Sequence, residues 1–158
     1  MRYYNAKLAK LFVFIIFSMS QTISVPSKEL VEKWETFPNS VVDVYISVIE
    51  DDGSVLAASI TAASVALSLA GIQVLDSLVA CSTVIPESSS NCPLLDPSRT
   101  EQESSPSQMT IAVMANSGEI AQIFLVGPCE NTLLKESMAL ATEGCSAIYE
   151  QIKPILLS

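Results

Sequence analysis

The 158-residue chain contains no histidine, and this absence excludes several kinds of chemistry. Histidine is the commonest general base and the commonest metal ligand in proteins. A Ser-His or Cys-His nucleophile therefore cannot form within the chain. Basic residues are also few, eight against seventeen acidic ones, which gives a net charge of −9. Because such a surface repels phosphate backbones, any role in handling nucleic acids needs partners that supply positive charge.

The four cysteines form neither a Cys-x-x-Cys pair nor a pair with histidine; they are Cys81, Cys92, Cys129 and Cys145. A zinc site is therefore not expected, and no other cofactor is indicated. Because hydrophobic residues make up 49% of the chain, we interpret the cysteines as four buried free thiols. Their even number leaves a second interpretation open, a small secreted α+β protein with two disulfides.

Residues 1–24 differ in composition from the rest of the chain. The basic start MRYYNAKLAK is followed by the apolar run LFVFIIFSMS and then by small polar residues. This order is typical of a secretory signal peptide, and the apolar run is too short for a comfortable membrane span. We interpret residues 1–24 either as a signal-like segment or as an aberrant start that arises from an unusual transcript or gene model.

The first half of the remaining chain predicts two helices around one strand. Residues 27–38 have the apolar spacing of a short amphipathic helix, and residues 40–50 are rich in the β-branched side chains of a strand. A turn is expected at DDGS, residues 51–54. The uncharged run 54–72 predicts a helix buried on nearly all sides, rather than a membrane helix, with Gly71 at its end.

The second half predicts further strands and one long helix. Residues 73–85 read as one or two strands, and 107–115 and 119–127 as a hairpin joined by Asn-Ser-Gly. Residues 86–108 contain four of the eight prolines and predict a loop. A helix is expected from about residue 131, with Pro154 at its end. The order of elements indicates an α+β fold, with helices packed on a mainly antiparallel or mixed sheet.

Four stretches of the chain are informative when they are taken together and in order: FPNSVVDVYISVIEDDGSVLAASITAASVALSLAGI, ACSTVI, LLDPSRTEQE and ATEGCSAIYEQI. Together they resemble the RNase PH family, and most closely the RNase PH-type subunits of the eukaryotic RNA exosome ring. The similarity covers about Leu30 to Leu157. It implies a mixed sheet packed with helices, like the second domain of ribosomal protein S5. It also implies that residues 28–158 form a partial RNase PH-like domain that lacks the family's N-terminal half, an incomplete fold with exposed sheet edges.

The resemblance also locates a candidate acidic site. Active members of the family carry an aspartate at the end of a strand and a second acid six residues later, which together position a divalent ion for phosphorolysis. Asp96 matches the first acid, but Gln102 stands at the second position, between Glu101 and Glu103. A lone carboxylate cannot do the work of a pair. We therefore interpret Asp96 as a relic and expect no catalytic, cofactor-binding or metal-binding residue.

The run LLDP with the acidic, serine-containing loop after it is most similar to the non-catalytic, mRNA-transport-regulator branch of the ring subunits. This implies a structural subunit that supports 3′–5′ RNA processing and decay. The expected partners are other RNase PH-type subunits and the cap subunits of the ring, with RNA contacted only indirectly and no membrane. The expected location is the nucleus and nucleolus, and also the cytoplasm. The alternatives are an active phosphorolytic exoribonuclease and the secreted protein described above.

Overall fold

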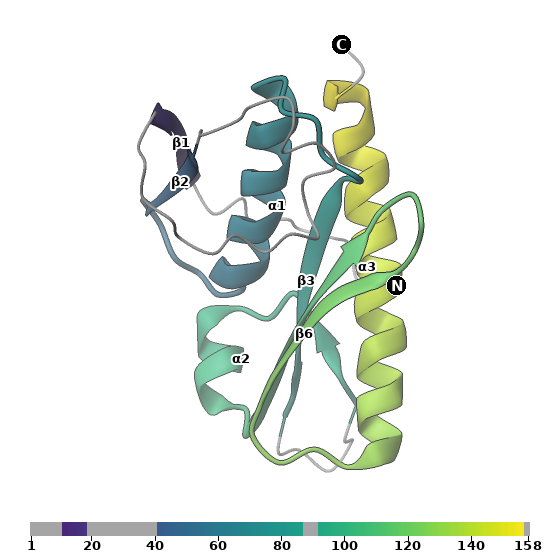
Figure 1. Ribbon diagram of the computed structural model, residues 1–158. Coiled ribbons are helices and arrows are strands. Elements are labelled where there is room, and N and C mark those ends of the chain that lie inside the picture. The colour runs from purple at the N-terminus through teal and green to yellow at the C-terminus, as the bar shows by residue number, and fades with distance from the viewer. Residues whose placement is uncertain (1–10, 19–40, 87–91, 157–158) are drawn as a thin grey trace.

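The computed structural model describes residues 11–18, 41–86 and 92–156, and it confirms the α+β class (Figure 1). The elements in chain order are β1 (Leu11–Ser18), β2 (Val41–Val48), α1 (Val55–Leu69), β3 (Leu78–Ile85), β4 (Leu94–Leu95), α2 (Arg99–Ser104), β5 (Ser107–Met114), β6 (Ile120–Val126) and α3 (Asn131–Leu156). The helix predicted within residues 27–38 lies outside the described residues. The strand predicted at 40–50 and the hairpin after residue 107 are confirmed as β2 and as the β5–β6 pair.

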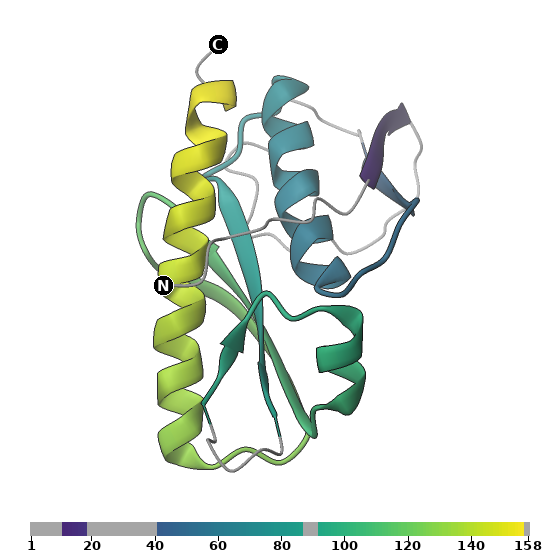
Figure 2. The same cartoon turned by 180° about the vertical axis from the view of Figure 1, so that it is seen from behind.

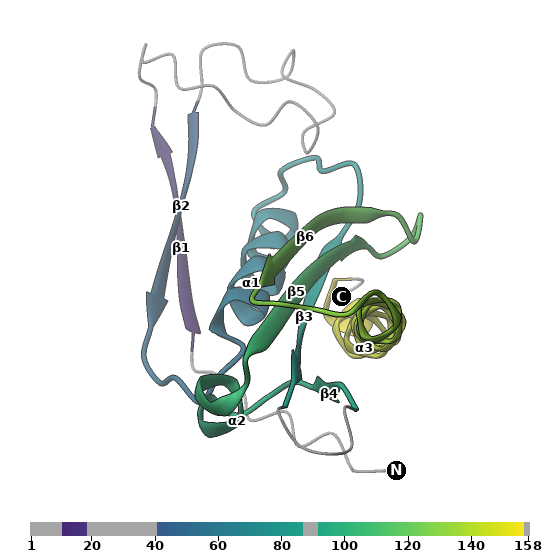
Figure 3. The same cartoon turned by 90° about the horizontal axis from the view of Figure 1, so that it is seen from below.

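The elements stack in layers, which Figures 2 and 3 show from behind and along the sheet. An antiparallel ribbon of β1 and β2 packs on α1, and α1 packs on a four-stranded sheet with the order β4-β3-β5-β6. All strand pairs of that sheet are antiparallel, and α3 covers its other face. Side chains of β3 and β5 therefore alternate between a core under α3 and a smaller core under α1.

The core under α3 is the larger of the two. Its buried members are Val79, Cys81, Met109, Ile111, Val113, Ala141 and Cys145, while the core under α1 is made by Ala57, Ala80 and Ala112. The small side chains of the second core let α1 approach the sheet closely. Two buried hydroxyls, of Thr83 and Ser137, have no hydrogen-bond partner among the described residues. A buried hydroxyl that stays unpaired costs about 1–3 kcal/mol.

Helix α1 has no charged residue, and it lies between the ribbon and the sheet. Only Ala57 and Ser64 of this helix are fully buried, and Leu69 is 63% exposed. The prediction of a helix buried on nearly all sides is therefore wrong, because two layers cover two sides of the helix and leave its flanks partly open. Gly71 ends the helix as predicted: it has φ +74°, its N–H donates to Ser68 O, and the Ile72 N–H donates to Leu67 O. No helix in the described part of the chain is long and apolar enough to cross a membrane.

Two predicted boundaries need correction. The segment 86–108, predicted as loop, contains β4 and α2, and α2 begins with a capping box formed by Ser98 and Glu101. The last helix continues past Pro154 to Leu156. Since a proline in the last turn removes only one hydrogen bond near a fraying end, the helix tolerates it there.

The four cysteines are free thiols, but they are not all buried. Cys81 and Cys145 lie in the core under α3, whereas Cys92 is exposed and Cys129 is partly buried. The prediction of four buried thiols is therefore wrong for Cys92 and Cys129, which precede β4 and α3 and lie outside the buried core. Burial raises the pKa of Cys81 to about 12 and that of Cys145 to about 11, because the thiolate would lose its hydration.

A carboxylate joins the loop after α1 to the β5–β6 turn. The side chain of Asp76 accepts hydrogen bonds from the Ser77 N–H (2.6 Å), the Asn116 N–H (3.0 Å), the Asn116 side-chain amide (2.6 Å) and the Ser117 N–H (3.0 Å). The Tyr149 hydroxyl donates in turn to Asn116 Oδ1 at 3.0 Å. Asp76 therefore links α3, the hairpin turn and the start of β3.

Replacing Asp76 with alanine is expected to lower the free energy of unfolding by about 2–3 kcal/mol, because four donors lose a charged acceptor. Urea unfolding followed by circular dichroism measures the change. The matched control is Glu143→Ala, at an exposed position of α3, where the expected change is within about 0.5 kcal/mol. Equal effects of the two substitutions would contradict this role of Asp76.

Candidate functional site

Asp96 follows directly after β4, as the resemblance implied. Its backbone N–H donates to Ser82 O of β3 at 2.9 Å, which continues the pairing of β4 with β3 for one more residue. The residue is exposed and takes a positive φ of 51°, where aspartate is more tolerant than most residues. The chain therefore turns sharply at Asp96 and leaves the sheet toward α2.

Helix α2 is a short helix whose start is well defined. The Ser98 hydroxyl accepts from the Glu101 N–H, and the Glu101 carboxylate accepts from the Ser98 N–H at 2.9 Å. This capping box satisfies donors at the helix start that would otherwise lack partners. The Glu101 side chain is thereby held at the N-terminus of α2. The next residue along the helix is Gln102.

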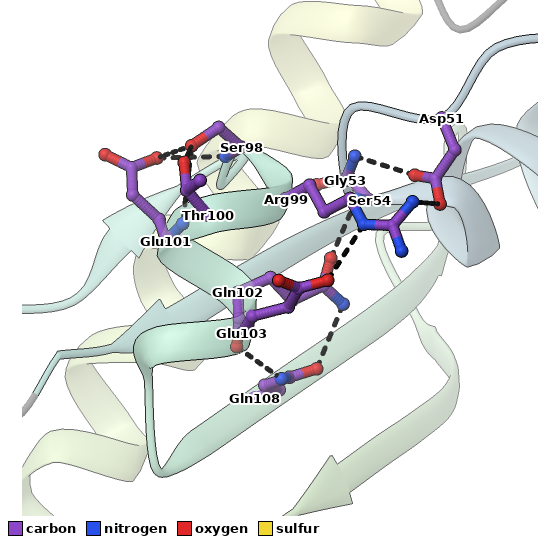
Figure 4. Close-up of polar contacts among 10 residues, drawn as sticks. All are labelled: Asp51, Gly53, Ser54, Ser98, Arg99, Thr100, Glu101, Gln102, Glu103 and Gln108. Carbon is purple, nitrogen blue, oxygen red and sulfur yellow. Dashed lines mark hydrogen bonds and ion pairs between the residues drawn. The ribbon is translucent and has the colours of Figure 1, made fainter.

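The Gln102 side chain is bound on both of its polar atoms (Figure 4). Its Oε1 accepts from the Ser54 N–H at 3.2 Å, at the start of α1, and its Nε2 donates to Gln108 Oε1 at 2.9 Å. The Gln108 side-chain amide donates back to the Gln102 backbone oxygen at 2.7 Å. Gln102 therefore joins α1, α2 and β5.

A second set of contacts joins the turn 51–54 to the start of α2. The Arg99 N–H donates to Asp52 O at 2.7 Å, and the Arg99 side chain contacts Asp51 at 3.4 Å and Glu103 at 2.8 Å. The hydrogen bond to Glu103 raises the pKa of Arg99 above its ordinary value. The Ser54 hydroxyl donates to Pro97 O at 3.3 Å. We call residues 51–54 together with residues 97–102 the turn–helix clasp.

The clasp requires the backbone at Gly53 to lie close to the backbone of residues 97–99. Gly53 has φ +102°, and a Cβ built there would lie 2.4 Å from Pro97 O and 2.8 Å from the Arg99 nitrogen. No other residue type fits this position without moving the backbone of the α2 segment. The clasp therefore requires glycine in the acidic turn.

The acids of this region are dispersed. Glu101 is used in the capping box, Glu103 and Asp51 contact Arg99, and Asp96 lies at the end of β4. Within residues 41–86 and 92–156, no three or more Asp, Glu, Cys or His side chains come close enough together to hold a metal ion. The structure brings Gln102 into the clasp, where its partners are Ser54 and Gln108; neither contact was predicted from the sequence.

The 3′ exoribonuclease family, domain 1 (RNase PH), matches residues 14–73 of the chain. The human protein "Exosome complex component MTR3" is 33% identical over 124 residues, which are 77% of this chain and 45% of that protein. The "Exosome complex component RRP41 homolog" of Arabidopsis thaliana is 31% identical over 122 residues, which are 77% of this chain and 49% of the relative. The chain belongs to the RNase PH family. It spans about half the length of the curated relatives it matches.

Among solved structures, the crystal structure of rice (Oryza sativa) Rrp46 has the same fold. The TM-score is 0.66 at 22% identity, over 75% of this chain and 55% of that one. This confirms the RNase PH-type α+β fold. The family match begins at residue 14, inside the segment 1–24, and residues 11–18 form β1, paired with β2. Part of the apolar run that was read as signal-like therefore lies in the region that matches the RNase PH family.

Proposed function

We propose that the chain is a structural, non-catalytic subunit of the RNA exosome ring and supports 3′–5′ RNA processing and decay. The relatives named exosome complex components support the assembly. The observation that carries the absence of catalysis is the side chain of Gln102. It stands where the resemblance places the second acid, and both of its polar atoms are bound within the fold.

The net charge of the chain affects how it would contact RNA in such an assembly. With a net charge of −9 it repels RNA, so basic neighbours among the RNase PH-type and cap subunits would contact the RNA, and this chain would do so only indirectly. The proposed location follows from that assembly: the nucleus and nucleolus, and also the cytoplasm. No cofactor or metal is part of the proposal.

The second candidate is an active phosphorolytic exoribonuclease. One observation favours it, because Asp96 occupies the expected position at the end of β4 and is exposed to solvent. A single carboxylate can contact a bound ion, but it does not fix the ion as a pair does. We therefore place this candidate second.

The purified chain is expected to release no nucleoside diphosphates from a short RNA in the presence of Mg²⁺ and phosphate. Asp96→Asn should leave the background unchanged, because the wild-type chain already lacks the pair of acids that positions the ion. A phosphorolytic RNase PH assayed in parallel provides the positive control. Diphosphate release that depends on phosphate and disappears in Asp96→Asn would establish the second candidate instead.

A further inference from the structure

The turn between β5 and β6 holds an asparagine and a serine against a carboxylate. Asn116 and Ser117 are adjacent and exposed, and Gly118 follows them. In an Asn-Ser pair, the backbone nitrogen of the serine can attack the side-chain amide carbon of the asparagine. The attack closes a succinimide ring and releases ammonia, and water then opens the ring to aspartate or isoaspartate. The groups that surround the pair decide how fast this deamidation runs.

Asp76 contacts both nitrogens whose protonation changes in this reaction. Its Oδ2 accepts from the Ser117 N–H at 3.0 Å, and its Oδ1 accepts from the Asn116 side-chain amide at 2.6 Å. The Ser117 nitrogen is the nucleophile and must lose its proton. The Asn116 side-chain nitrogen is the leaving group and must gain one. A carboxylate within hydrogen-bond distance of both can carry the proton from the first to the second.

Tyr149 of α3 contacts the third atom that changes its charge. The Tyr149 hydroxyl donates to Asn116 Oδ1 at 3.0 Å. When the nitrogen adds to the amide carbon, negative charge develops on this oxygen. A donor that is already in place stabilises the charge without further rearrangement. The nucleophile, the leaving group and the developing oxyanion therefore each have a partner of suitable chemistry.

The backbone of the turn holds these groups beside Asp76. The Asn116 N–H also donates to Asp76 Oδ2, at 3.0 Å, and the Gly118 N–H donates to Met114 O at 2.8 Å. The reacting pair and the carboxylate are therefore kept together, which lowers the entropic cost of bringing them into contact. Since the turn is exposed, the water that opens the ring has access to it.

We infer that Asn116 is a site of self-catalysed deamidation, in which Asp76 carries the proton and Tyr149 donates to the oxyanion. The bond from the Ser117 nitrogen to Asn116 Cγ forms, and the Asn116 Cγ–Nδ2 bond breaks. The Ser117 proton passes through Asp76 to the departing nitrogen, which leaves as ammonia. Water then opens the ring, so no oxidant and no other protein is required. The inference goes beyond the proposed function, because this covalent change does not depend on any role in RNA turnover.

The product would alter the fold at the point where it forms. A carboxylate at position 116 would lie beside Asp76, and the two like charges would repel each other. The contacts that join the hairpin turn to the start of β3 and to α3 would weaken. Deamidation would therefore mark an aged chain by loosening this junction.

The test compares the full folded chain with a synthetic peptide of residues 112–121, which has the same local sequence but lacks Asp76 and Tyr149. Both are incubated at neutral pH, and deamidation at Asn116 is followed by mass spectrometry, with isoaspartate measured by enzymatic methylation. The folded chain is expected to react about tenfold faster than the peptide. An equal or slower rate in the folded chain would overturn the inference, because order in the turn would then protect Asn116.

Three variants of the full chain separate the two roles from the effect of charge. Tyr149→Phe keeps the ring but removes the donor, and should slow the reaction about fivefold. Asp76→Ala should lower the rate to that of the peptide, whereas Glu119→Gln removes a carboxylate of the same turn that contacts neither reacting nitrogen and should keep the wild-type rate. If Asp76→Ala does not fold, Tyr149→Phe decides, and an unchanged rate there would overturn the inference. The phosphorolysis assay is unaffected by these outcomes, so the two proposals fail independently.

Discussion

Replacing Gly53 with alanine is expected to lower the free energy of unfolding by about 3 kcal/mol or more. The added Cβ would lie 2.4 Å from Pro97 O and 2.8 Å from the Arg99 nitrogen. Both neighbours are backbone atoms, so the clash cannot be relieved by a side-chain rotation. The positive φ of 102° adds conformational strain of about 1–2 kcal/mol for a residue with a Cβ.

The matched control is Gly71→Ala, at the end of α1. Gly71 also has a positive φ, +74°, but a Cβ built there meets nothing within 4 Å. This variant should show the conformational strain alone, about 1 kcal/mol. Urea unfolding of both variants at one pH provides the comparison, and equal losses in the two would show that close approach at Gly53 is not the cause.

The same substitution tests the position of Gln102. If Gly53→Ala pushes the α2 segment away from the turn, the Ser54 N–H loses Gln102 Oε1 as its acceptor. Hydrogen exchange at the Ser54 amide should then become faster, while exchange in β5 away from Gln108 should change little. The clasp would thereby be shown to hold Gln102 in place.

Local sequence patterns predicted the elements whose signals lie within a few residues. Strand β2 followed from its β-branched residues, and the β5–β6 turn followed from Asn-Ser-Gly, where Gly118 has φ +73°. Helix α2 was missed because serine and proline dominate its surroundings. Its signal was nevertheless present, since Ser98 and Glu101 have the spacing of a capping box.

The contacts within the candidate site could not be predicted from local sequence patterns. The identity of Gln102 at the expected position of an acid could be read from the sequence. Its partner Ser54 is 48 residues away, and nothing in either local pattern indicates that the two meet. A contact between distant segments depends on packing of the whole fold, here on the close approach at Gly53. The sequence therefore indicated Asp96 and Gln102 as candidate residues, but not the contacts that Gln102 makes with Ser54 and Gln108.

The free energy of unfolding is expected to fall by several kcal/mol between pH 9 and pH 11, because two buried thiols resist ionisation. The pKa of Cys81 is raised to about 12 by burial and by the neighbouring Cys145, and that of Cys145 to about 11 by burial. Both values lie above the ordinary value of 9.0, so the folded state holds the two protons more tightly than the unfolded state does. This stability is fully present below pH 9 and is lost as the pH rises toward the folded values, by about 2 kcal/mol for each thiol at pH 11.

Urea unfolding at pH 8, 9, 10 and 11, with a phosphine reductant, measures this loss. Tyrosine and lysine also titrate in this range, so the comparison requires matched variants. Cys92→Ala removes an exposed thiol and should keep the wild-type dependence on pH. The double variant Cys81→Ala, Cys145→Ala should be less stable at pH 8, because it leaves cavities in the core under α3, but should lose less stability between pH 9 and pH 11. Parallel pH profiles for the wild-type chain and the double variant would show that these thiols do not govern the alkaline loss.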